Sequence, residues 1–179
     1  GNVEMTSTEH KCGSDRIKEV VIRHPEIAYI VNLQGDEPLI KPESIDEVAK
    51  NVKFDKTADI STLIRKITPE EAENPNLVKC IVNCNGFAMY FSRSKIPFER
   101  NQGKAEFFGH LGIYGYKREA LIKMTELPQS TYEQAESLEQ LRALQNGMTI
   151  KTSVVDFVPV GIDTAEDLER FKDIVAHSA

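Results

Sequence analysis

The sequence predicts an α/β fold in which a mostly parallel, Rossmann-like sheet carries an antiparallel arm over residues 77–117. An apolar run at 27–33 and an alternating run at 58–67 have the character of strands, and an amphipathic segment starting at Pro42 lies between them. Strand, helix and strand at this spacing indicate a crossover between parallel strands. Asn85-Gly86 separates two further apolar runs and is a strong signal for an antiparallel hairpin.

Composition limits the class of protein. The chain has 179 residues, which suits one domain with a substantial core, and it is 40% hydrophobic and 28% charged. A net charge of −6 argues against nucleic acid as a partner, because that function needs a basic surface. No apolar run is long enough to cross a bilayer and no signal peptide opens the chain, so we expect a cytoplasmic protein without a membrane partner.

The three cysteines fit neither a disulfide framework nor a zinc site. Cys80 and Cys84 lie four residues apart in a strand-like run, and no histidine lies beside them. We expect them to be core or sheet-face residues.

The first predicted helix begins at Ser14 or Asp15 and ends at Pro25, with apolar residues at helical spacing. A Gly-Ser pair ahead of a helix offers free backbone N–H groups to an anion, and Arg16 is suited to a phosphate or a base edge. The alternative is a capped surface helix with a solvated arginine.

Two adjacent carboxylates, Asp36 and Glu37, follow the predicted buried strand at 27–33. In open α/β sheets, ligands bind beyond the carboxyl ends of the strands, and a carboxylate there is well placed to bind Mg²⁺ that carries substrate phosphates. An ordinary solvated turn is the alternative.

The second half of the chain contains the longest predicted strand and helix. The strand at 107–117 places polar and aromatic residues on one face and apolar residues on the other, a pattern typical of a binding surface, although a lone histidine in a strand is more often structural. A long helix is predicted at 132–146, from which Glu139 and Gln140 project away from the buried stripe. The remaining predicted elements are helices at 118–127 and after Asp163-Thr164, and a strand at 148–155.

Segments spread over nearly the whole chain, from about Met5 to Leu168, resemble the 3-deoxy-manno-octulosonate cytidylyltransferases, also called CMP-KDO synthetases. These segments are Gly13-Ser14-Asp15-Arg16, Val31-Asn32-Leu33-Gln34-Gly35-Asp36-Glu37-Pro38, Ser92-Arg93-Ser94-Lys95-Ile96-Pro97, His110-Leu111-Gly112-Ile113-Tyr114-Gly115-Tyr116, Leu138-Glu139-Gln140-Leu141-Arg142 and Gly161-Ile162-Asp163-Thr164-Ala165-Glu166-Asp167-Leu168.

The resemblance implies a sheet of the nucleotide-diphospho-sugar transferase type and a homodimer formed with the arm. It implies that the chain uses CTP to activate 3-deoxy-D-manno-octulosonate (KDO), giving CMP-KDO and pyrophosphate for lipopolysaccharide biosynthesis. Asp36 and Asp163 would be the catalytic residues and the ligands of a Mg²⁺ cofactor.

The same resemblance assigns two further groups of residues. The implied nucleotide-binding residues are Gly13, Ser14, Arg16 and Gln34. The implied sugar-acid-binding residues are Arg93, His110, Tyr114, Glu139 and Gln140. A carboxylate beside an amide suits a polyhydroxylated ligand, because the carboxylate accepts from hydroxyls and the amide both donates and accepts.

One element of the resembled family is missing from the sequence, namely the Gly-Ser-x-Arg-Leu-x-Gly-Lys loop that holds the triphosphate. We therefore expect a single cytidylyltransferase domain over residues 1–179 that is truncated at its N-terminus, and its activity alone is open. Two alternatives remain. One is a sister enzyme of the CMP-sialic acid type, and the other is a non-catalytic, dimerising fragment that binds the sugar.

Overall fold

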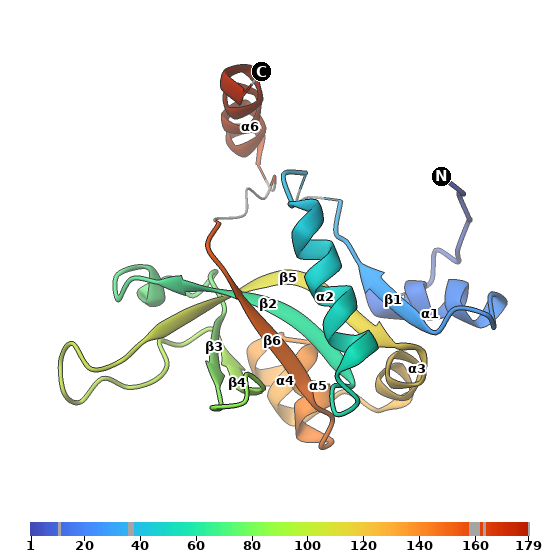
Figure 1. The fold of residues 1–179 in the computed structure, drawn as a ribbon, viewed down its shortest axis with the longest axis horizontal. Helices are drawn as coiled ribbons and strands as arrows, with labels where there is room; N and C mark the ends of the chain where they lie inside the picture. The colour runs from blue at the N-terminus through green and yellow to red at the C-terminus, as the bar shows by residue number, and fades with distance from the viewer. Residues whose placement is uncertain (11, 36–37, 158–161, 163, 179) are drawn as a thin grey trace.

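The structure is a computed structural model that describes every residue except 11, 36–37, 158–161, 163 and 179. Six strands form one sheet, with helices on both of its faces (Figure 1). The strands are β1 (Tyr29–Asn32), β2 (Ile60–Ile67), β3 (Lys79–Val82), β4 (Ala88–Ser92), β5 (Phe107–Lys117) and β6 (Ile150–Val155). The helices are α1 (Gly13–Arg23), α2 (Pro42–Phe54), α3 (Arg118–Glu126), α4 (Thr131–Glu136), α5 (Gln140–Gln145) and α6 (Ala165–Ser178), with a 3₁₀ turn at Glu71–Glu73.

The directions of the strands confirm the predicted fold class. β2 and β6 pair in parallel, whereas β5 pairs antiparallel with both β1 and β2. Outside the arm, the three strands β1, β2 and β6 therefore all run the same way. The last strand of the arm, β5, is inserted between β1 and β2, so these two strands are not adjacent although they are consecutive in the sequence.

One edge of β5 has two different neighbours. β2 occupies the other edge along the whole strand, from the pair Ile60–Tyr116 to the pair Ile67–Phe107. On the edge of β5 that faces away from β2, β1 pairs with residues 114–117, while β3 pairs with Gly109. His110 N donates to Val78 O just before β3, so a gap remains between the end of β1 and this contact, opposite residues 111–113 of β5.

The core lies on both faces of the sheet. Helix α2 covers one face of the sheet (Figure 1). There Val48 packs with Leu63, Leu111 and Ile113. A Cβ atom at Gly115 would lie only 2.7 Å from Val48 Cγ1, so this close approach of α2 to β5 requires a glycine. The larger apolar cluster lies on the opposite face, between the sheet and the helices α1, α3 and α5.

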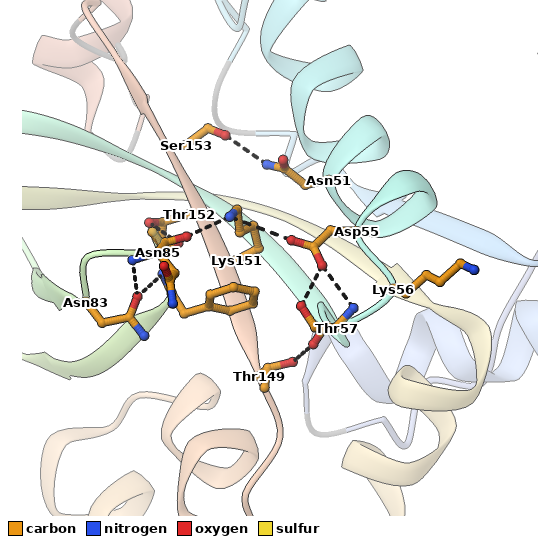
Figure 2. A network of polar contacts seen from close by, with 12 residues as sticks. Asn51, Asp55, Lys56, Thr57, Asn83, Asn85, Thr149, Lys151, Thr152 and Ser153 are labelled. Atoms are coloured by element: carbon orange, nitrogen blue, oxygen red, sulfur yellow. Dashed lines mark hydrogen bonds and ion pairs between the residues drawn. The ribbon is translucent and has the colours of Figure 1, made fainter.

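The turn of the β3–β4 hairpin docks onto the edge strand β6 (Figure 2). Gly86 adopts φ +75°, as the Asn-Gly signal predicts, and its carbonyl accepts from Thr152 N at 2.8 Å and from Thr152 Oγ1 at 3.0 Å. Lys151 Nζ donates to Asn85 O at 2.7 Å and lies 4.6 Å from the centre of the Phe87 ring. These contacts protect part of the exposed edge of β6.

Three expectations about individual elements are wrong. The helix predicted at 132–146 is two short helices, α4 and α5, because Ser137 adopts a left-handed conformation with φ 53° and ends the first of them. The strand β1 is not buried: Tyr29 is exposed and residues 30–32 are half-buried, because β5 is its only paired neighbour among the described residues. The predicted cap of α1 also differs, since Cys12 holds the N-cap position.

Candidate active site

A cleft of about 520 Å³ opens at the gap on the edge of β5. Elements that are distant in the sequence meet there: the start of α1, the end of β1, the polar face of β5 and the start of α5. Seven residues named from the sequence line this cleft, which are Gly13, Ser14, Gln34, His110, Tyr114, Glu139 and Gln140.

The face of β5 that lines the cleft is the one that the alternation predicts. His110, Gly112, Tyr114 and Tyr116 all lie on it, and the rings of His110 and Tyr114 are 5.2 Å apart between centroids. Burial raises the pKa of both tyrosines, so their hydroxyls stay protonated and are able to donate hydrogen bonds. Tyr116 and Gly112 are lining residues to which the sequence assigned no role.

The imidazole of His110 is neutral at physiological pH. Burial lowers its pKa to about 3, because a charged ring loses hydration there. Nε2 lies 2.9 Å from Thr62 Oγ1 on β2. The ring of Phe91 packs edge-on against it, 5.1 Å away between centroids.

The carboxylate of Glu139 lies beside the start of α1. Ser14 Oγ donates to Glu139 Oε2 at 3.1 Å, and Cys12 Sγ donates to Glu139 Oε1 at 3.3 Å. Burial, together with the negative charge of Glu139, raises the pKa of the Cys12 thiol to about 11, so the thiol remains a donor. Glu139, which is implied to bind the sugar acid, and Ser14, which is implied to bind the nucleotide, are therefore in direct contact.

Gln34 is held at the mouth of the cleft by an irregularity in β5. The register between β2 and β5 shifts at Thr62/Leu63, so Gly112 and Ile113 form a bulge. Gln34 Nε2 donates to the carbonyl of Gly112 at 3.2 Å. The polar residue Asn32, at the end of β1, lines the same region, and the alternation of the strand did not single it out.

The two implied arginines lie outside the cleft lining. Arg16 donates from its NH1 group to Thr6 Oγ1 at 2.5 Å and to Ser7 O at 3.1 Å. Arg93 donates from Nε to Glu136 O at 2.8 Å and from its NH1 group to Pro75 O at 3.3 Å. All four acceptors are uncharged oxygens.

Asp36 and Asp163, the implied metal ligands, lie outside the described residues. Within the part of the chain that the structure describes, no group of three His, Cys, Asp or Glu side chains is arranged to hold a metal ion.

A buried ion pair that the sequence did not predict supports the start of α5. Arg142 donates to the carboxylate of Glu133 twice, from Nε at 2.8 Å and from its NH2 group at 2.5 Å. Glu133 also forms a capping box with Ser130 at the start of α4. Burial opposes ionisation of Glu133, but hydrogen bonds from Arg142 and from the Ser130 backbone lower its pKa overall. The pair joins α4 to α5, whose N-cap residue is Glu139.

None of the helices in the described ranges has both the length and the apolar character needed to cross a lipid bilayer.

Comparison with known proteins places the chain in a family. A family model described as cytidylyltransferase matches residues 1–150. The 3-deoxy-manno-octulosonate cytidylyltransferase of Escherichia coli is 42% identical over 98% of this chain and 71% of its own length. The protein of the same name from Nitrobacter winogradskyi is 46% identical over 100% of this chain and 72% of its own.

Solved structures agree. A structure of CMP:2-keto-3-deoxy-manno-octonic acid synthetase in complex with CTP superposes with a TM-score of 0.96 at 40% identity, covering 100% of this chain and 74% of that one. A glucose-1-phosphate thymidylyltransferase from Bacillus anthracis has a TM-score of 0.59 at 12% identity, over 94% of this chain and 62% of that one, and therefore shares the fold alone. The chain belongs to the 3-deoxy-manno-octulosonate cytidylyltransferase family.

Proposed function

We propose that this chain catalyses transfer of a cytidylyl group from CTP to 3-deoxy-D-manno-octulosonate, giving CMP-KDO and pyrophosphate. The observation that carries the proposal is that one cleft gathers side chains from four of the sequence segments that resemble the family. Relatives whose names state this activity share more than 40% of their aligned residues with the chain.

In this reaction an oxygen of the sugar acid attacks the α-phosphate of CTP. The new bond joins that oxygen to phosphorus, the bond from phosphorus to the bridging oxygen of pyrophosphate breaks, and the sugar hydroxyl loses its proton. Such transfers depend mainly on positioning and on neutralising charge. The cleft supplies positioning groups: Glu139 accepts from hydroxyls, Gln140 donates and accepts, and Tyr114 donates.

We propose that Asp36 and Asp163 bind Mg²⁺. The donor set fits this ion, because Mg²⁺ prefers carboxylate oxygens and substrate phosphates. The strands β1 and β6, which precede the two aspartates in the sequence, run in the same direction. When bound, the ion supplies positive charge to the phosphates and to the attacking oxygen.

Positive charge from the protein would come from Arg16 toward the nucleotide and from Arg93 toward the sugar carboxylate. Both guanidiniums donate to uncharged oxygens, so exchanging those bonds for an anion strengthens the interaction.

We further propose a homodimer and a cytoplasmic location. The outer strand β4 presents the exposed Met89 on the arm, which suits burial against a second copy. Cys12, Cys80 and Cys84 are free thiols, as expected in a reducing compartment.

Calorimetric titration with CTP and Mg²⁺, with and without KDO, tests the proposal. We expect CTP binding that disappears in Asp36→Ala and in Asp163→Ala, and pyrophosphate release only when KDO is added. An Asp46→Ala variant, on the exposed side of α2, is the matched control and should behave as the unchanged chain. Pyrophosphate release with sialic acid but not with KDO would refute the choice of sugar, and a folded chain that neither binds CTP nor releases pyrophosphate would refute catalysis by this chain.

A further inference from the structure

The hydroxyl of Thr62 lies between His110 and the bulge of β5. Thr62 is fully buried on β2, on the same face of the sheet as the cleft. Its Oγ1 atom has three neighbours within hydrogen-bonding distance: Ile113 O at 2.7 Å, His110 Nε2 at 2.9 Å and Leu111 O at 3.2 Å.

The position of each proton follows from the chemistry of these atoms. A threonine hydroxyl has one proton to donate, and a carbonyl oxygen only accepts. Two oxygens 2.7 Å apart need a proton between them, so the Thr62 hydroxyl donates toward Ile113 O, with Leu111 O as a weaker second acceptor. The remaining contact, between Thr62 Oγ1 and His110 Nε2, therefore needs its proton on Nε2, and the Nε2–H group donates a hydrogen bond to Thr62 Oγ1.

A neutral imidazole has only one N–H group, so Nδ1 of His110 is an acceptor. Every fully buried side-chain nitrogen or oxygen in the described residues has a hydrogen-bond partner. Since Nδ1 has none among them, it is not fully buried, and the imidazole lines the cleft.

We propose that Thr62 is a positioning residue that holds His110 as the Nε2–H tautomer, so that Nδ1 accepts a hydrogen bond from a hydroxyl of the ligand in the cleft. Because Nδ1 presents a lone pair, it favours a ligand hydroxyl, which donates a hydrogen bond. It disfavours an ionised carboxylate or phosphate oxygen, which has no proton to donate. The identity of that ligand as KDO rests on the proposed function.

The surroundings of the ring keep this orientation. Phe91 packs edge-on at an interplanar angle of 77°, and Tyr114 lies on another side at 45°. A flip of the ring would take Nε2–H away from Thr62 Oγ1, its one acceptor among the described residues, and a buried N–H group that loses its partner costs about 1–3 kcal/mol.

The ¹⁵N resonances of the histidine rings test the tautomer without reference to catalysis. In the unchanged chain we expect a protonated, pyrrole-type Nε2 and a pyridine-type Nδ1 for His110, assigned by comparison with His110→Gln. Thr62→Val keeps the shape of the side chain but removes the hydroxyl, so we expect both tautomers to appear. Thr62→Ser keeps the hydroxyl and should retain the Nε2–H form. A protonated Nδ1 in the unchanged chain would overturn the proposal, whatever the variants do.

Steady-state kinetics test the consequence for the ligand. Loss of one hydrogen bond in substrate binding predicts a KM for KDO about tenfold higher in Thr62→Val, with the KM for CTP unchanged, and Thr62→Ser within about twofold of the unchanged chain. A KM for KDO that stays the same in a folded Thr62→Val chain would refute the role in substrate binding. If the unchanged chain does not turn over KDO, the proposed function fails, and the ring resonances still decide the tautomer.

Discussion

Replacing Arg142 by methionine should destabilise the chain strongly, because it breaks a buried ion pair. The side chains of Arg142 and Glu133 are only 7% and 6% exposed, and their two hydrogen bonds are the main compensation for burying two charges. Arg142→Met keeps most of the volume of the side chain but leaves the carboxylate of Glu133 buried without its cation.

The expected loss is about 3–5 kcal/mol, the range for breaking a buried pair by removing one partner. This is a large part of a total free energy of unfolding of about 5–15 kcal/mol. With a urea m-value of about 2 kcal/mol/M, the midpoint of unfolding should fall by about 2 M.

Urea unfolding followed by circular dichroism measures the loss, and two variants serve as controls. Arg100→Met removes an exposed arginine and should change stability by less than about 0.5 kcal/mol. The double variant Glu133→Leu/Arg142→Met removes both charges and should recover most of the loss, apart from about 1 kcal/mol for the lost capping box. A cost below about 1 kcal/mol for Arg142→Met would refute the reasoning that this pair holds α4 and α5 in place.

Three further outcomes follow from the structure. Gly115→Ala should cost about 1–3 kcal/mol in thermal unfolding, because its Cβ would lie 2.4 Å from Ser61 Oγ, whereas Gly13→Ala, with open space around it, should not lower the unfolding temperature. Burial lowers the pKa of His110 from 6.5 to about 3, so between pH 6.5 and about pH 3 the imidazole binds a proton in the unfolded chain but not in the folded one. The contribution of the neutral, buried ring to stability is therefore fully present above pH 6.5 and is lost as the pH falls below it. Between pH 7 and 5 the unchanged chain should lose about 2 kcal/mol more than His110→Gln in urea unfolding, and equal losses would contradict the low pKa. At pH 8, Cys84 should be alkylated first in a mass-spectrometric time course, because its thiol is exposed and burial raises the pKa of the other two to about 11 and 12; early labelling of either of those would show that it is not protected.

Local chemistry made much of the fold predictable. Pro42 starts α2, Gly86 turns the hairpin and the period-two alternation of β5 places His110 and Tyr114 on one face, because each of these depends on neighbours in the sequence. The grouping of seven of the named residues in the cleft agrees with the resemblance to the family.

The predictions from sequence are wrong where contacts with residues distant in the sequence determine the local structure. Helical periodicity runs through residues 132–146, but the helix ends at Ser137 and a second one follows. The buried hydrogen bond between Arg142 and Glu133 joins these two short helices. The apolar run at 27–33 predicts a buried strand, but β1 is exposed or half-buried, because such a run does not reveal how many strands lie beside it.

Apart from the helix at 132–146, the sequence by itself determined the elements, their approximate bounds, the alternation of faces and the family, because these are properties of short segments and of their order. Only the tertiary structure decided that β5 enters between β1 and β2, that a cleft opens on its edge, and that Thr62 faces His110 across a bulge. The physical reason is that the pairings of β5 with β1 and β2 and the hydrogen bonds of Thr62 join residues 40 or more positions apart, and no local pattern encodes which partner a buried hydroxyl will have.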